Sequence, residues 1–384
     1  MANALRTALA AVTLAAASAT AAHAQADSVF AVSSGGASLL RLNTDGSLVV
    51  RGTAGQGVIP AAGDGVRMMW FPAKYAFRAG RVVTVSPSNE GTYWDDEHVG
   101  YGSVAFGQNN RASGNNSAAF GDAARATGER SFAFNGTATS TGAIALGSSA
   151  QATGDDALAM GLSPIAGGLA SIVIGPSIAN GNFGVAIGLQ NSASGQFSVA
   201  IGKNARTANR QGAVVLGDAC ASFSSDSVYP TANNQFVARG CGGIRFFTTQ
   251  NLSSGVEVAA GGGSWSSISD RNRKENFRAL EGEPVLTRLR SVPVTTWNYK
   301  TQDRSIRHIG PTAQDLYAAF GVGESSLLIN TVDIDGINLA AAKELDARTA
   351  AQEARIGALE AENAELKSRL ERLEARLGEP AAQP

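Results

Sequence analysis

The chain has 384 residues, of which only 16% are charged, and its formal net charge is −1. This length exceeds what one simple hydrophobic core accommodates, so several domains are expected. The near-neutral charge provides no basic field, and we therefore expect neither nucleic acid nor an anionic membrane surface as a partner. The 45 glycines, set against 7% aromatic residues, indicate a chain of small side chains and tight turns.

Residues 1–24 are typical of a secretory signal peptide. Arg6 supplies a positive charge, residues 9–17 form a short apolar run, and Ala22-His23-Ala24 has the small-residue pattern of a cleavage site. The run is too short to span a bilayer, and no later stretch reaches spanning length. We expect the mature chain to begin after Ala24 and to contain no membrane-spanning segment. We expect it to be secreted, extracellular or at the cell surface.

Residues 25–100 are expected to form an N-terminal β region that caps a larger β structure. Residues 39–50 alternate around Asp45-Gly46, which is a hairpin turn signal. An apolar cluster between Met68 and Phe77 is expected to plug the open end of the structure that follows.

Residues 94–98, Trp94-Asp95-Asp96-Glu97-His98, are the chain's acidic-aromatic cluster. We interpret them as a surface loop. The alternative is half of a glycosidase site, because paired carboxylates flank the bond that those enzymes cut.

Residues 101–217 repeat a short phrase in which small and apolar residues alternate before a glycine. Its nine copies end at Gly107, Gly121, Asn135, Gly147, Gly161, Gly175, Gly188, Gly202 and Gly217. Most steps are 14 residues long, with single steps of 12, 13 and 15. The alternation is that of a strand, and the glycines permit the turns between strands. One coil cannot bury its apolar side alone, so we expect stacked coils, a β-solenoid with a core of small uncharged groups.

The phrase Ser198-Val199-Ala200-Ile201-Gly202 resembles the head repeats of YadA-type trimeric adhesins. The resemblance covers about residues 100–217 and implies a left-handed parallel β-roll, three of which pack side by side in a trimer. That family's C-terminal membrane anchor has no counterpart in the pattern after residue 217, where ten-residue alternating strands are lacking. We therefore expect no such anchor.

Residues 218–263 are expected to be a β connector that contains both cysteines, Cys220 and Cys241. An even pair in an oxidising compartment favours a disulfide, and two free buried thiols are the alternative. The histidines at 23, 98 and 308 lie far along the chain from both cysteines and from each other, so no zinc site is expected. We expect no cofactor.

Ser269 and Lys274 lie five residues apart after a run of three glycines. A neutral lysine amine can take the proton of a serine hydroxyl, and the activated serine can then attack a carbonyl. The nearest is that of Ile268, in the peptide bond that precedes the serine. The other interpretation is an exposed loop serine and a solvated lysine.

Residues 269–276 resemble the start of the intramolecular chaperone domain at the C-termini of phage tailspikes and endosialidases. Residues 309–315 resemble the same family's I-G-x-x-A-Q-[DE] signature, and the resemblance spans residues 264–384. It implies a domain that trimerises, guides folding of the fibre before it and then cuts itself off. By this resemblance Ser269 is the nucleophile, Lys274 the general base and Ile268–Ser269 the cleaved bond. Asp270, His308 and Gln314 are supporting residues: Asp270 shapes the turn, and the other two support the site or the trimer contact.

Residues 343–384 are expected to form a coiled-coil helix and a tail. The apolar seam has heptad spacing and comprises Ile356, Leu359, Asn363, Leu366, Leu370, Leu373 and Leu377. The flanking pairs Arg355–Glu360, Glu362–Lys367 and Arg369–Glu374 are opposite in sign, which favours parallel self-association over packing on the same chain's domain. Asn363 at an a position often favours dimers, whereas both resemblances imply three chains.

The sequence therefore predicts a mainly β chain. Its trimeric left-handed parallel β-roll head precedes an α+β intramolecular chaperone and autoprotease domain over 264–342 and a parallel coiled coil. The predicted function is a secreted, adhesin-like homotrimeric fibre that drives its own assembly and then self-cleaves once through a Ser/Lys dyad. Its ligand would be a glycan or protein of a host or surface. The alternatives are a secreted glycan-degrading enzyme on a fibre scaffold and a prophage tail fibre.

Overall fold

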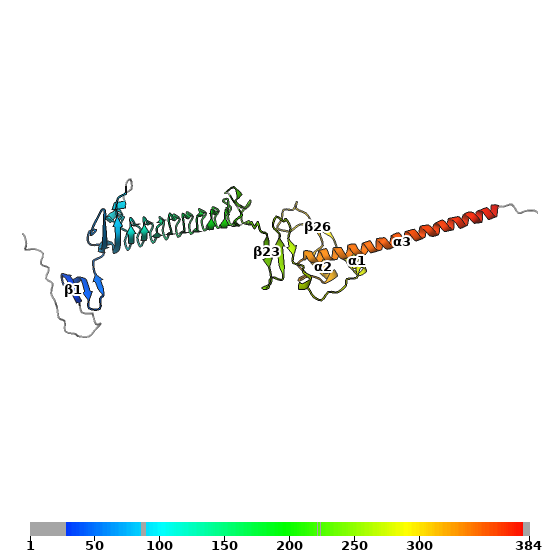
Figure 1. Cartoon of the computed structure of the whole chain (residues 1–384), viewed down its shortest axis with the longest axis horizontal. Coiled ribbons are helices and arrows are strands. Elements are labelled where there is room, and N and C mark those ends of the chain that lie inside the picture. Colours follow the sequence, from blue (N-terminus) through cyan, green and yellow to red (C-terminus); the bar gives the residue numbers. More distant parts are fainter. Residues whose placement is uncertain (1–27, 86–89, 221, 223, 379–384) are drawn as a thin grey trace, which may run out of the picture. The chain divides into compact units, whose positions relative to one another are not determined.

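A computed structural model describes residues 28–85, 90–220, 222 and 224–378 (Figure 1). The predicted signal peptide and its cleavage site lie outside these residues. The chain divides into two compact units, Met1–Gly243 and Ile244–Pro384. Among the described residues, no helix combines the length and the apolar composition needed to cross a membrane.

The first unit begins with a small antiparallel sheet of β1 (Ser28–Ser34), β2 (Ala37–Asn43) and β3 (Leu48–Val50). The predicted hairpin is confirmed, because β2 and β3 pair around Asp45 and Gly46. The Asp45 carboxylate accepts hydrogen bonds from the hydroxyl and from the backbone N–H of Ser47, and these bonds lower the pKa of that carboxyl.

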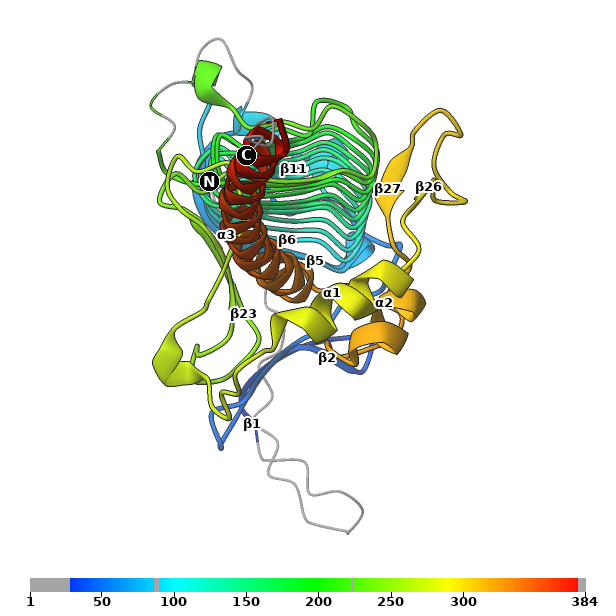
Figure 2. The same cartoon turned by 90° about the vertical axis from the view of Figure 1, so that its right-hand side faces the viewer.

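The repeats form a β-solenoid of two sheets whose coils stack along one axis (Figures 1 and 2). The long sheet has 12 strands and the short sheet has seven. The long sheet contains β4 (Gly65–Phe71), β5 (Ala76–Val82), β6 (Val104–Gln108), β8 (Ala118–Asp122), β10 (Phe132–Phe134), β12 (Ile144–Leu146), β14 (Leu158–Met160), β16 (Ile172–Ile174), β18 (Val185–Leu189), β20 (Val199–Lys203), β21 (Val214–Gly217) and β22 (Phe236–Ala238). The short sheet contains β7 (Arg111–Ala112), β9 (Arg125–Ala126), β11 (Thr137–Ala138), β13 (Gln151–Ala152), β15 (Ile165–Ala166), β17 (Ile178–Ala179) and β19 (Ser192–Ala193).

Neighbouring strands are parallel and in register, apart from the antiparallel pair β4 and β5. Short 3-10 turns occur at Pro72–Lys74, Glu90–Thr92, Asp96–His98 and Ser224–Asp226. The mainly β fold with a solenoid head is thus confirmed.

Alanine fills the space between the two sheets. The central residue of each repeat phrase is fully buried, and it is alanine in seven copies and valine in two. The second residue of every short-sheet strand is a fully buried alanine as well. Corner glycines allow adjacent coils to approach closely: a Cβ at Gly147 (φ +125°) would meet the carbonyl oxygen of Gly161. The predicted core of small uncharged groups is confirmed.

At the first coil, Trp94 and the apolar cluster between Met68 and Phe77 lie differently from what the sequence predicts. Trp94, expected in a surface loop, is fully buried, and its Nε1 donates to the carbonyl oxygen of Asn110 at 2.9 Å. The expected plug between Met68 and Phe77 instead forms parts of β4 and β5, and Met68 is 74% exposed. Met69 and Phe71 are buried, but strand alternation turns Met68 outward, so only part of the predicted plug faces the core.

Arg78 is buried beside this end of the solenoid. Its guanidinium donates to the carbonyl oxygens of Phe77, Ser103 and Ala112 and to the Ser103 hydroxyl. These acceptors are neutral, so removal from water lowers the pKa of Arg78 to about 10.

The last coils are extended by β22 and closed by a disulfide between Cys220 and Cys241, whose Cα atoms lie 6.4 Å apart. The Asp218 carboxylate accepts hydrogen bonds from the backbone N–H of Cys241 and from Arg239. The hydrogen bond from the backbone N–H of Cys241 contributes most to lowering the pKa of Asp218.

The second unit begins with an antiparallel sheet of β23 (Ile244–Phe247), β24 (Gly255–Val258) and β25 (Ser266–Ser267). A 3-10 turn (Arg271–Arg273), α1 (Gly282–Ser291), the antiparallel pair β26 (Thr295–Trp297) and β27 (His308–Gly310), α2 (Ala313–Phe320) and α3 (Thr331–Gly378) follow. A small core joins the three helices and comprises Val285, Leu286, Val292, Leu316, Ile337 and Ala341.

The alanine core predicts a sensitivity to larger side chains. Ala159→Leu in β14 should lower the free energy of unfolding of the full chain by about 1–3 kcal/mol, because the buried site cannot expand without shifting its neighbours. Chemical denaturation followed by circular dichroism measures this loss. Gln151→Leu, at an exposed position of β13, is the matched control and should change the stability little. Equal stability of the two variants would contradict the narrow interior.

Candidate functional site

Ser269 and Lys274 meet in the second unit. The Nζ of Lys274 donates to the Oγ of Ser269 at 2.6 Å. The 3-10 turn Arg271–Arg273 produces this contact by reversing the chain between the two residues. Its N-cap is Asp270, whose Oδ1 accepts from the backbone N–H of Asn272 at 2.9 Å. The capped turn therefore holds an amine against a hydroxyl, as a serine nucleophile and its base require.

The peptide bond before the serine lies at the edge of the β23–β25 sheet. The backbone N–H of Ile268 donates to the carbonyl oxygen of Gly255 at 3.1 Å, which holds Ile268 to β24. On the other side of the bond, Arg273 donates to the carbonyl oxygen of Leu252 in the β23–β24 connection. The chain is thus fixed on both sides of the Ile268–Ser269 bond.

Both members of the pair are exposed in the single chain, as are all the residues from 269 to 280. A lysine amine becomes neutral near neutral pH when burial or a nearby cation disfavours its charge. The single chain supplies the contact between the two groups but does not enclose them.

His308 and Gln314 occupy other positions in the second unit. The His308 ring lies 4.8 Å from that of Trp297 and 5.6 Å from that of Tyr299, and its Nε2 is paired with Gln302 at 2.9 Å. Gln314 is exposed in the first turn of α2. Within the described residues, no hydrogen bond joins either side chain to Ser269 or Lys274.

The acidic cluster at residues 95–97 makes structural contacts. The Asp95 carboxylate accepts a hydrogen bond from the backbone N–H of Gly63 at 2.7 Å. Asp96 forms an ion pair with Lys74 at 2.8 Å. Asp95 and Asp96 therefore connect the acidic cluster to two earlier residues of the chain, Gly63 and Lys74.

A second candidate surface is the outer face of the long sheet, which we call the outer apolar face. It consists of the residues on either side of the buried central residue in each repeat phrase. The side chains of Phe134, Ile144, Ile172 and Ile174 are 47%, 38%, 38% and 38% exposed. Aromatic rings on successive strands contact one another, with 5.5 Å between the ring centres of Phe106 and Phe120.

This face was not predicted from the sequence, because the apolar side of the coils was assigned to the internal core. Coil stacking buries the alanines, whereas the larger Phe, Ile, Leu and Val side chains point away from them. The signal was present in the alternation itself: with alanine inward at the centre of a phrase, both of its neighbours must point outward.

The predicted coiled-coil seam lies on α3, a continuous helix of 48 residues. Ile356, Leu366 and Leu370 are 55%, 53% and 56% exposed, and the other seam residues are exposed as well. Among the described residues of one chain, the seam residues therefore remain exposed.

Two family models match the chain. Residues 99–124, 112–134, 138–163 and 179–205 match the model of the YadA head domain repeat (2 copies). Residues 269–322 match the chaperone of endosialidase model, which begins at the candidate nucleophile. The chain carries YadA head repeats followed by a chaperone of endosialidase domain. No curated protein matches the chain at a significant level. The two family models confirm the predicted resemblances and their order.

The capped turn at the serine–lysine pair predicts a local effect of Asp270. In a Ser269→Ala background, Asp270→Ala should increase the hydrogen exchange rate of the Asn272 amide, because the substitution removes its acceptor. Amide exchange followed by NMR or mass spectrometry measures the rate. Asp270→Asn retains an acceptor oxygen and should stay close to the parent. Equal protection in all three proteins would mean that the cap does not hold the turn.

Proposed function

We propose that the chain is a secreted, trimeric, adhesin-like surface fibre. In this proposal, its C-terminal domain assembles the trimer and then cuts the Ile268–Ser269 bond once. The two family models support a fibre or adhesin-like protein of trimeric families with a chaperone domain. Proteins of the YadA-like adhesin and tail-fibre kind are extracellular or at the surface.

The outer apolar face is the observation that carries the trimer proposal. A row of large apolar side chains along successive strands of one sheet is unusual on a soluble monomer and marks an association surface. Its regular register supplies a self-complementary strip along the length of the solenoid. Three parallel chains that direct these faces toward a common axis would remove the strip from water.

The seam of α3 supports the same assembly. Its apolar positions are exposed along the C-terminal half of the helix, and the flanking charges would pair favourably between parallel chains in register. A C-terminal coiled coil holds chain ends close together, which raises their effective concentration. Parallel solenoid strands assemble slowly when they must find their partners unaided, so early alignment would benefit the head.

The contact between Ser269 and Lys274 supports the cleavage step. Lys274 Nζ, once neutral, accepts the hydroxyl proton while Ser269 Oγ attacks the carbonyl carbon of Ile268. The C–N bond breaks, the proton passes to the departing nitrogen, and Ile268 becomes esterified to the serine oxygen. Water then hydrolyses the ester and leaves a carboxylate on Ile268 and a free amino group on Ser269.

Trimer assembly would also determine when this reaction occurs. The lysine is exposed in the single chain. Neighbouring chains that cover the pair would disfavour the charge and produce the neutral amine. Cleavage would then follow trimer formation rather than precede it.

The Cys220–Cys241 disulfide supports secretion, because such bonds persist mainly in oxidising compartments. After loss of the chaperone domain the head could not easily reassemble, so its stability would be kinetic. This suits a fibre that remains outside the cell.

Cleavage predicts a fragment that begins at Ser269 in the purified protein, identified by intact mass and N-terminal sequencing. Ser269→Ala should abolish the fragment, and Lys274→Met should reduce its rate of formation at least about a hundredfold, the usual contribution of a general base. Ser267→Ala, two residues away and also exposed, is the control and should cleave normally. A Ser269→Ala protein that still yields the fragment would refute the assignment of the nucleophile.

The trimer proposal predicts the mass of the mature species in native mass spectrometry. Wild-type protein should have three chains, and Ile174→Asp on the outer apolar face should weaken association at least about tenfold, because each chain would bury a charge. Thr137→Asp on the outer side of the short sheet is the control and should remain trimeric. A well-folded single chain at working concentration would refute the proposal.

A further inference from the structure

Two coils of the solenoid are shorter than the others, and both are shortened at the same corner. This corner joins each long-sheet strand to the following short-sheet strand. Gly161 and Ile165 enclose three residues there, whereas Gly175 and Ile178 enclose two. Asn135 and Thr137 enclose one. The steps of 13 and 12 residues in the repeat are therefore deletions from one edge of the solenoid.

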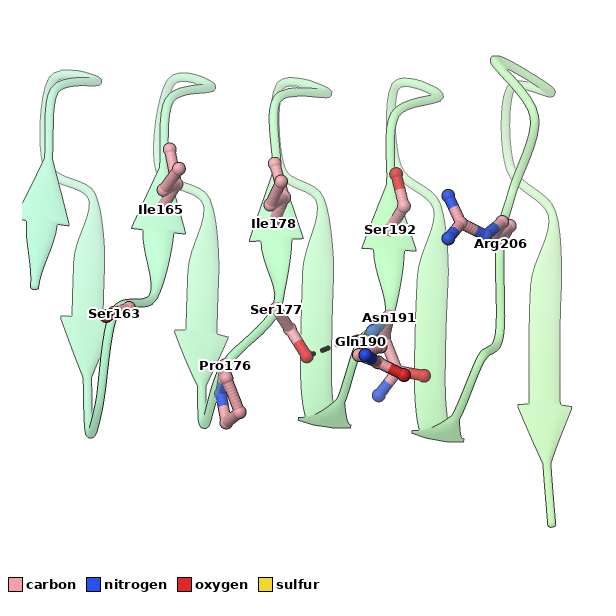
Figure 3. A pocket seen from close by; sticks show the side chains of 9 residues that line it. All are labelled: Ser163, Ile165, Pro176, Ser177, Ile178, Gln190, Asn191, Ser192 and Arg206. Carbon is pink, nitrogen blue, oxygen red and sulfur yellow. Dashed lines mark hydrogen bonds between the residues drawn. The ribbon is translucent and has the colours of Figure 1, made fainter. Parts of the chain in front are cut away.

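Each deletion leaves a notch between the full-length corners on either side. The notch at Pro176 has a volume of about 320 Å³ (Figure 3). Ile165, Ile178 and Pro176 provide an apolar surface, with Gln190, Ser192 and Arg206 farther along. A polar notch of about 430 Å³ lies at Asn135 and Gly136.

The backbone in the Pro176 notch is already hydrogen bonded. The N–H of Ile165 donates to the carbonyl oxygen of Ser177, and the N–H of Ile178 donates to that of Asn191. An extended peptide therefore cannot join these strands through main-chain hydrogen bonds. A ligand must be recognised by side chains, which here offer apolar surface, hydroxyl, amide and guanidinium groups.

Arg206 gives the notch its charge. It follows Ile165, Ile178 and Ser192 in the outward row of the short sheet, and its guanidinium extends toward the strand of Ser192 (Figure 3). Its Nε donates to the Ser227 hydroxyl at 2.8 Å, which fixes its orientation. In the described part of the chain it forms no ion pair. A fixed, half-buried guanidinium without a carboxylate partner favours an anionic ligand.

We propose that this notch binds an acidic saccharide. One ring would pack its C–H face on Ile165, Ile178 and Pro176. Its hydroxyls would bond the side chains of Gln190 and Ser192, and its carboxylate would bond Arg206. The volume lies within the range of small-ligand sites. The notch belongs to the side of the solenoid opposite the outer apolar face, so it stays open in the proposed trimer. The inference rests on the proposed adhesin-like function for its biological setting, but the site lies within one chain.

The test is calorimetric titration of the mature protein with a hexasaccharide of alternating glucuronate and N-acetylglucosamine. The wild type should bind it, and a neutral hexasaccharide of N-acetylglucosamine should bind at least about tenfold more weakly. Arg206→Gln keeps hydrogen-bond donors but removes the charge, and should weaken binding at least about tenfold. Arg125→Gln, in the same outward row but outside the notch, is the matched control and should bind like the wild type.

A further variant inserts an asparagine between Pro176 and Ser177, which restores the missing corner residue and should abolish binding by filling the notch. If this variant fails to fold, the two arginine substitutions still decide the question. A sulfated neutral oligosaccharide distinguishes a sulfate from a carboxylate, and stronger binding of the sulfated sugar would overturn the carboxylate assignment.

The site is refuted if the wild type does not bind at millimolar saccharide, or if the two arginine variants behave alike. Native mass spectrometry of the same sample reports the chain number separately. A trimer that does not bind would refute the notch alone, whereas a monomer that binds would refute the trimer alone.

Discussion

The narrow space between the two sheets of the solenoid governs the rest of the head. It accepts alanine at nearly every inward strand position of the repeats and valine at two, so the coils stack closely but enclose little apolar volume. The Phe, Ile, Leu and Met side chains of the repeat phrase then point outward, where one chain covers them only in part. The same constraint thus fixes the coil geometry and generates the outer apolar face. In the proposed trimer, such a head would gain the remainder of its burial from other chains, which would link oligomerisation to folding.

Much of the fold could be predicted from the sequence because the repeat is local and periodic. The alternation in phrases such as Ser198–Gly202 fixes strands, and the regular step fixes their stacking. The burial of Trp94 could not be predicted in this way. Trp94 lies between turn residues and acidic residues, and its burial depends on the open end of the repeats, whose first strand, β6, begins at Val104. Long-range packing of a single side chain leaves no periodic signal.

The candidate site likewise has one feature that the sequence predicts and another that it does not. The five-residue spacing of Ser269 and Lys274, with Asp270 placed to cap a turn, is local information and leads to the observed contact. Enclosure of the pair would depend on surfaces of other chains in the proposed trimer, and the sequence pattern around the pair does not show them. The notch at Pro176 has a different origin. Its signal was the step of 13 residues in the repeat, which acquires meaning only when the missing residue is located at a particular corner.

The position of the Ile268–Ser269 bond has a consequence for what remains after the reaction. The compact second unit begins at Ile244, so the cut would pass through that unit rather than through a linker before it. The strands β23, β24 and β25 would stay on the head, with Phe246 and Trp265 still in ring contact. They would lose the support that Arg273 gives to the Leu252 turn. The finished fibre would therefore keep a small sheet that is left over from its assembly. This sheet would end in a new carboxylate at Ile268 and would lack the contact with Arg273.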